Sequence, residues 1–108
     1  MDSNNLAYVG LAHRAGKTLI GTAACEKGLK RGIIKLLLLQ DGLSASTIDK
    51  FTYICSKNDV DVLMVSGYYR LGLAIGKEGI MIIGITDTGF ADTIKKTIIG
   101  GQGSGINE

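Results

Sequence analysis

Very few residues in this sequence could hold a metal ion or form a disulfide. The 108 residues include one histidine, His13, and two cysteines, Cys25 and Cys55, which are not paired in a CxxC motif. A structural zinc site needs about four closely grouped ligands, and small disulfide-stabilised domains are dense in cysteine. We therefore expect no metal site, no disulfide framework and no bound cofactor.

Signals for membrane insertion and secretion are also missing. No uncharged apolar run approaches the roughly 18 residues that a membrane-spanning helix needs. The N-terminus carries Asp2 and lacks the basic segment, followed by an apolar stretch, that marks a secretory signal. The sequence therefore predicts a soluble, cytoplasmic protein with no membrane partner.

An excess of one sign of charge is small over the whole chain but larger in its first third. The formal net charge is +2. Residues 1–40 hold six basic residues against two acidic ones, which gives +4 there and −2 in residues 41–108. A basic segment can attract a polyanion even when the whole chain is close to neutral.

Proline is absent, so glycine and small polar residues separate the expected elements. Hydrophobic spacing predicts five helices: one from a Ser3 cap to a stop at Gly16, one from a Thr22 cap to Gly32, one capped by Ser44 or Ser46, one over Tyr68–Ile75 and one capped by Asp87 or Thr88. Strands are predicted over Thr18–Ile20, Ile33–Leu39, Val60–Val65 and Ile80–Ile85, with a loop over Gln40–Leu43.

This alternation of helices and strands predicts the fold class. Aliphatic runs such as 33–39 and 60–65 are typical of strands buried on both faces. Helices between strands imply crossover connections and helical layers on both sides of the sheet. We expect an α/β protein, a three-layer α/β/α sandwich around a four-stranded mixed sheet. The domain should span residues 1–99, followed by a flexible glycine-rich tail over residues 100–108.

One segment imitates a nucleotide-binding motif. Gly10–Thr18 reads GLAHRAGKT and resembles a P-loop, but five residues rather than four separate Gly10 from the Gly16–Lys17 pair. The segment also follows a predicted helix and precedes a strand, whereas a P-loop follows a strand and opens a helix. His13 falls on the apolar face of the first helix, where a packed, hydrogen-bonded histidine is a better interpretation than a catalytic base.

No other group of residues assembles a nucleophile, a base and an orienting partner. Cys25 and Cys55 fit helix positions and are expected to be buried rather than reactive. We therefore expect no catalytic residues and no enzymatic activity.

Two longer segments carry a family resemblance. They are LAHRAGKTLIGTAACEKGLKRG, from Leu11 to Gly32, and LGLAIGKEGIMIIGITDTGFADTI, from Leu71 to Ile94. With the aliphatic strand and DGLS loop between them, they resemble the kink-turn-binding ribosomal-protein superfamily of the archaeal protein L-seven-Ae. The RAGK, LGxAIGK and ITDxGFA patterns are most similar to its small bacterial branch. The resemblance covers about residues 4–98 and implies an α/β/α sandwich that clamps a sharply bent RNA at tandem sheared G·A pairs.

The resemblance places the main RNA contact at the start of the second helix, where archaeal members often carry Gly-x-Asn-Glu-x-x-Lys. Gly21 and Lys27 match this pattern, but Ala23 and Ala24 stand at the Asn and Glu positions that normally read base edges. Physical chemistry supports the same place, because a helix start at Thr22 directs unpaired N–H groups at a phosphate.

Other expected RNA contacts lie around this helix start and on two loops. Positive charge should come from Lys17 just before the helix and from Lys27 and Arg31, which share a helix face. The resemblance implies a second contact from the loop after the fourth helix, which packs apolar groups against a flipped base, and from the nearby strand end. The residues concerned are Ser66, Gly67, Gly76, Lys77, Glu78, Gly79 and Ile80.

Three functional hypotheses remain open on these patterns. The first is a non-catalytic module that binds kink-turn RNA, in ribosomal or riboswitch-type RNA, as a monomer and without a DNA partner. The second is the same fold without RNA binding, acting as a protein-interaction module, which Ala23 and Ala24 favour. The third is a nucleotide-dependent enzyme, which only the GKT tripeptide favours. The basic residues of the second helix could also be an ordinary solvated face.

Overall fold

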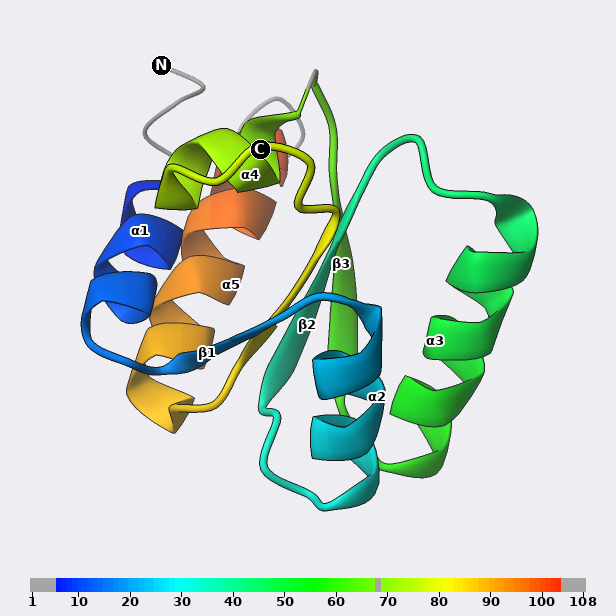
Figure 1. The fold of residues 1–108 in the computed structure, drawn as a ribbon. Coiled ribbons are helices and arrows are strands. Elements are labelled where there is room, and N and C mark those ends of the chain that lie inside the picture. Colours follow the sequence, from blue (N-terminus) through cyan, green and yellow to red (C-terminus); the bar gives the residue numbers. More distant parts are fainter. Residues whose placement is uncertain (1–5, 68, 104–108) are drawn as a thin grey trace.

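The structure, a computed structural model, describes residues 6–67 and 69–103 and follows the predicted alternation of helices and strands (Figure 1). The elements are α1 (Ala7–Arg14), β1 (Thr18–Ile20), α2 (Thr22–Lys30), β2 (Leu36–Gln40), α3 (Ala45–Lys57), β3 (Asp61–Val65), α4 (Arg70–Ile75), β4 (Ile82–Ile85) and α5 (Thr88–Gly103). None of the helices in this described part is long and apolar enough to cross a membrane.

The four strands form one mixed sheet in the order β1-β4-β2-β3. Strands β2 and β3 run parallel, and β4 pairs antiparallel with both β1 and β2. The last strand of the chain is therefore inserted between the first and the second. This confirms the predicted four-stranded mixed sheet.

The sheet is covered on both faces, which confirms the predicted three-layer sandwich. Helices α1, α4 and α5 lie on one face, and α2 and α3 lie on the other (Figure 1). Successive side chains of a strand point to opposite faces. In β2, Leu36 and Leu38 accordingly pack with the first group of helices, while Leu37 and Leu39 pack with the second. The aliphatic run of β2 therefore serves both cores.

Strand β3 differs from its prediction as a buried strand. It lies at one end of the strand order, and its residues Asp61 and Met64 are exposed. The aliphatic sequence was the only sign used to predict burial, and an edge strand can carry the same composition. Position in the sheet depends on partners far away in the chain, which that composition does not encode.

Hydrogen bonds decide between the alternative cap residues that were predicted for two helices. Ser44, rather than Ser46, caps α3 by accepting a bond from the Thr47 N–H at 3.2 Å. Asp87, rather than Thr88, accepts the bond from the Phe90 N–H at 2.9 Å at the start of α5. The Ser3 cap predicted for the first helix lies outside the described residues.

The end of α5 corrects part of the predicted tail. The helix continues to Gly103, so the segment 100–103 is helical rather than the beginning of a flexible tail. Glycine disfavours a helix by only about 1 kcal/mol per residue and keeps its backbone N–H, so glycines at the end of an established helix need not stop it. Residues 104–108 lie outside the described part of the chain.

Candidate functional site

The start of α2 is an open helix terminus formed by an unusual turn at Gly21. This residue has φ +93°, a conformation that L side chains rarely adopt, and it occupies the N-cap position that the sequence analysis gave to Thr22. The Gly21 N–H donates to the Ile82 carbonyl at 3.0 Å, which ties the turn to β4. Among the described residues, no side chain caps this helix, and Thr22 and Ala23 are exposed. The first N–H groups of α2 therefore face solvent with a partial positive charge.

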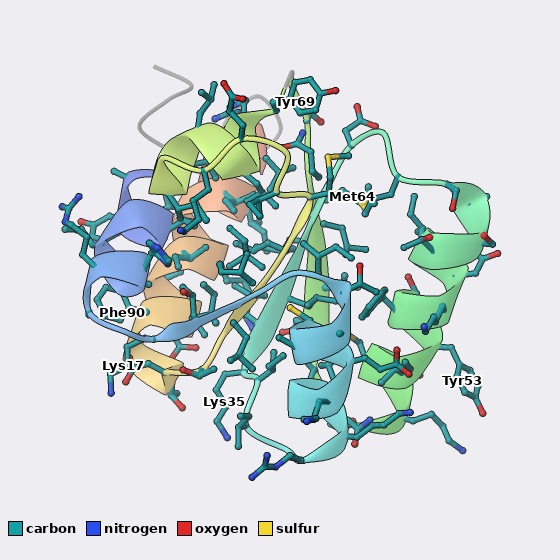
Figure 2. The ribbon with its side chains drawn as sticks, in the orientation of Figure 1. Lys17, Lys35, Tyr53, Met64, Tyr69 and Phe90 are labelled. Atoms are coloured by element: carbon teal, nitrogen blue, oxygen red, sulfur yellow. The ribbon has the colours of Figure 1, made fainter. Side chains whose placement is uncertain are left out.

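Lys17 does not lie beside this terminus, contrary to the prediction. Its carbonyl accepts a bond from the Thr86 N–H at 2.9 Å, at the end of β4, whereas Gly21 pairs with Ile82 at the beginning of β4. The two residues stand at opposite ends of β1, about 13 Å apart for four residues of extended chain. In Figure 2, Lys17 lies on the side of α5 and away from α2, which agrees with its bond to Thr86. Four residues are close in sequence but not in space, because a strand advances about 3.3 Å per residue.

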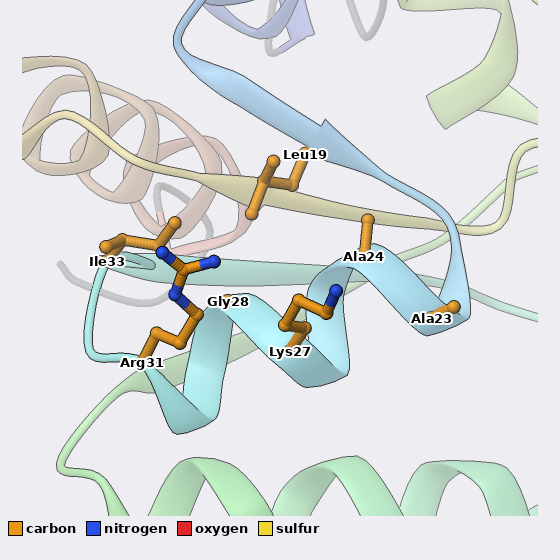
Figure 3. A pocket seen from close by; sticks show the side chains of 7 residues that line it. All are labelled: Leu19, Ala23, Ala24, Lys27, Gly28, Arg31 and Ile33. Atoms are coloured by element: carbon orange, nitrogen blue, oxygen red, sulfur yellow. The ribbon is translucent and has the colours of Figure 1, made fainter.

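A groove runs along α2 beside the edge strand β1, and it collects four predicted site residues. Its volume is about 260 Å³. The lining residues, drawn in Figure 3, come from β1, α2 and the segment that follows α2: Leu19, Ala23, Ala24, Lys27, Gly28, Arg31 and Ile33. Sequence reasoning missed Leu19 and Ile33, because nothing local indicates that the end of α2 and strand β1 enclose one hollow.

The positive charge on the groove side of α2 is not neutralised. Within the described part of the chain, neither Lys27 nor Arg31 takes part in a salt bridge. On the side facing α3, Glu26 binds both Lys50, at 2.8 Å, and Lys30, at 3.1 Å. The hydrogen bonds from Lys50 and then Lys30 hold the pKa of Glu26 below its usual value. One face of the helix is thus a compensated ion-pair network, and the other keeps its cations available.

The two predicted loops lie at the same end of the sheet as the start of α2. Gly76–Ile80 lead directly into β4, whose Ile82 carbonyl binds Gly21. Ser66 and Gly67 follow β3, which is the strand farthest from β1 at this end of the sheet. Two carboxylates, Asp41 and Glu78, line neighbouring hollows of about 490 and 640 Å³ here. Neither carboxylate lines the α2 groove.

Gln40 positions one of these loops, and the sequence analysis had placed it in a loop itself. It is fully buried at the end of β2, where its side-chain amide donates to Val65 O at 3.0 Å and to Gly67 O at 2.6 Å. Its side-chain oxygen accepts a bond from the Leu71 N–H of α4 at 2.8 Å. One side chain therefore links β2, the loop after β3 and the start of α4. A polar residue that ends an aliphatic run was the only signal in the sequence.

An apolar surface lies next to the loop after α4, from which the resemblance implied apolar contacts to a flipped base. Leu73 is 72% exposed and Tyr69 is 45% exposed, and both line the 640 Å³ hollow with Glu78 and Gly79. The loop lies close against α4. A Cβ on Gly72 would lie only 2.4 Å from the Lys77 carbonyl oxygen, so glycine is what allows this approach. The apolar groups here come from α4 rather than from the loop.

The residues considered for catalysis are packed. His13 Nδ1 and Thr18 Oγ1 lie 2.9 Å apart, which agrees with the expected hydrogen-bonded histidine. Cys25 and Cys55 are 0% and 1% exposed, as predicted, and burial raises their pKa values to about 12 and about 11. The segment with the GKT tripeptide connects helix α1 to strand β1, the reverse of the P-loop order.

The fold and the groove together define the class of this protein. This is a small α/β/α sandwich whose mixed sheet presents a helix start and an adjacent cationic groove. A model of the ribosomal protein L7Ae/L30e/S12e/Gadd45 family matches residues 4–95. The chain belongs to this family, which confirms the superfamily indicated by the RAGK, LGxAIGK and ITDxGFA patterns.

Individual relatives agree with this assignment. The chain is 35% identical over 86 residues to RNA-binding protein YlxQ of Bacillus subtilis, covering 80% of this chain and 86% of YlxQ. A Bacillus halodurans structure of unknown function is 30% identical with a TM-score of 0.84, covering 89% of this chain and 97% of that one. The Giardia lamblia 15.5kD RNA binding protein shares the fold at 13% identity and a TM-score of 0.74, with 94% and 86% of the two chains covered.

Proposed function

We propose that this protein binds structured RNA and recognises a kink-turn, a sharply bent duplex with sheared G·A pairs, without catalysing a reaction. The observation that carries the proposal is the open, uncapped start of α2 with the unneutralised cations of Lys27 and Arg31 on the adjacent face. Family membership and the names of YlxQ and the Giardia protein support RNA as the ligand. The RNA would be ribosomal or riboswitch-type RNA, bound by a monomer in the cytoplasm.

The contact at α2 would recognise backbone rather than sequence. The free amides at Thr22 and Ala23 can donate to a phosphate, and Gly21 lets the RNA backbone come close. Ala23 and Ala24 offer no side-chain donor or acceptor for a base edge. Contacts of this kind position an RNA without reading it, so selectivity would come from the shape of the bend.

The sheet edge beyond Gly21 would supply the second contact. In this proposal Ser66, Gly67 and the loop from Gly76 to Ile80 approach the other side of the bend, with Leu73 offering the apolar surface for a flipped base. Lys17 lies too far from Thr22 to share its phosphate. It would reach a different point of the RNA backbone.

A matched pair of lysines on α2 tests the proposal. Lys27→Ala should lower affinity for a kink-turn RNA by about 1–3 kcal/mol, the scale of a hydrogen bond to a charged group. Lys30→Ala changes the same residue type on the same helix, but Lys30 is bound to Glu26, so affinity should stay nearly constant. A loss below about 0.3 kcal/mol for Lys27→Ala would remove that residue from the interface.

The RNA itself is the second control. The protein is titrated with a kink-turn RNA and an unbent duplex at two salt concentrations, with a nucleotide-binding control. Affinity should favour the bent RNA and fall steeply with salt, because neutralised phosphates release counterions. Equal, weak binding to both RNAs would favour a protein-interaction module. Hydrolysis of a bound nucleoside triphosphate would instead favour a nucleotide-dependent enzyme.

A further inference from the structure

The α2 groove combines an apolar interior with a cationic rim. Leu19, Ala24 and Ile33 line it with hydrocarbon side chains, and the charged side chains among its lining residues are those of Lys27 and Arg31. Figure 3 shows the Arg31 guanidinium near Ile33 and the Lys27 amine directed toward Ala24. A phosphate alone would leave the apolar walls unused, and an apolar ligand would leave both cations without a partner.

Short residues on α2 let the helix lie close beside β1, so that both elements line one groove. Gly28 is buried where α2 crosses β1, and a Cβ there would lie 2.5 Å from Leu19 Cδ1 and 3.0 Å from Ile34 Cδ1. Only glycine lets the helix approach the strand this closely without displacing Leu19. Ala24, one turn earlier, keeps the same side open.

We propose that this groove holds one unstacked nucleotide of the bound RNA, with its base against Leu19 and Ile33 and its phosphate at Lys27 and Arg31. The inference rests on the proposed function and adds a site along the body and end of α2, beyond the contact at its start. The face of a nucleobase is apolar and stacks on hydrophobic or guanidinium groups, while its phosphate is anionic. Both halves of the groove are then used.

Size and chemistry also set the expected selectivity. A volume of about 260 Å³ suits a single base and not a stacked run. Pockets for drug-sized ligands span roughly 300–1,000 Å³. The walls carry no neutral donor or acceptor side chain that could read a base edge. Binding should therefore depend on the presence of a base, with purines favoured for their larger face, and only weakly on base identity.

A mononucleotide tests the groove without any folded RNA. The full-length protein is titrated with adenosine monophosphate while the methyl signals of Leu19 and Ile33 are followed by NMR. Both should shift saturably below about 20 mM, a range that covers the millimolar affinity of one small contact. Ribose 5-phosphate and inorganic phosphate, which lack the base, should leave these methyls nearly unmoved. Equal shifts with all three compounds, or none with any, would overturn the proposal.

Two exposed isoleucines give a matched pair for the RNA complex. Ile33 is 42% exposed in the groove, and Ile99 is 48% exposed on α5, so serine at either position should leave folding intact. Ile33→Ser should weaken binding of a kink-turn RNA about fivefold, the scale of one lost apolar contact, while Ile99→Ser should not change it. If the two variants bind the RNA with equal affinity, the groove is not part of the RNA interface, and the proposed function still stands. If neither variant nor the unaltered protein binds the RNA, the proposed function fails instead.

Discussion

The buried amide of Gln40 offers the sharpest test of how the loops of the candidate site are held. Gln40→Met keeps the length of the side chain and removes all three of its hydrogen bonds. The Val65 carbonyl retains a bond from the Asp41 N–H at 2.8 Å, and Gly67 is exposed enough to reach water. The Leu71 N–H is buried and would be left without a partner.

The expected loss of stability follows from the Leu71 N–H, which, unlike the Val65 and Gly67 carbonyls, has no other partner in the described part of the chain or in water. A stranded buried N–H costs about 1–3 kcal/mol, and losing the bond to Gly67 adds about 1 kcal/mol, so Gln40→Met should lower the free energy of unfolding by about 2–4 kcal/mol. Urea denaturation measures this directly, with the m-value unchanged if only stability differs. A small domain has about 5–15 kcal/mol in total, so the change is easily resolved.

Gln40→Glu separates hydrogen bonding from packing. The carboxylate would still accept from Leu71 but would face the Val65 and Gly67 carbonyls, which raises the pKa of the new carboxyl. Because the folded state then holds the proton more tightly than the unfolded state, the variant should gain stability relative to the native sequence as pH falls. A loss below about 0.5 kcal/mol for Gln40→Met, or a pH-independent gap for Gln40→Glu, would refute this account of the loop.

Two further predictions concern titratable groups. Cys25 and Cys55 are buried with pKa values raised to about 12 and about 11, so a thiol reagent at mildly alkaline pH should label neither in the native protein and both after unfolding; labelling of the native thiols would contradict their burial. Because the pKa of Glu26 is lowered in the folded state, its bonds to Lys50 and Lys30 stabilise the fold near neutral pH. This stabilisation is lost as the pH falls below 4.5, the usual pKa of a glutamate, and then through the lowered pKa of the folded state. Acid unfolding should therefore be less steep for Glu26→Gln, and identical pH profiles would exclude a role for this network.

Much of the local structure could be predicted because it depends on neighbouring residues. The spacing of apolar residues predicted each helix and strand, and Ser44 and Asp87 were among the caps considered. Gly21 was expected at the RNA contact because it matches the family pattern, and its φ of +93° explains why glycine stands there. The ends of elements were less certain, as at α5, because glycine weakens a helix without forbidding it.

The arrangement of the site could be predicted only in part. Their spacing of four residues predicted that Lys27 and Arg31 share a helix face, and in the structure both line one groove. Lys17 was assigned to the same terminus from its closeness in sequence, and the extended conformation of β1 carries it away. Leu19 was predicted in a strand, but its position as a wall of the groove depends on packing against α2.

By itself, then, the sequence determined the order and type of the elements, the leucine run that fills both cores, and the basic character of one face of α2. Tertiary structure alone decided that β4 lies between β1 and β2, which leaves β3 at an edge and makes β1 the border of the groove. It also decided that Gln40 joins three segments and that Leu19 and Ile33 line the same groove as Lys27 and Arg31. The physical reason is that helix and strand propensities act between neighbours in the chain, whereas strand order and grooves arise from contacts between distant residues.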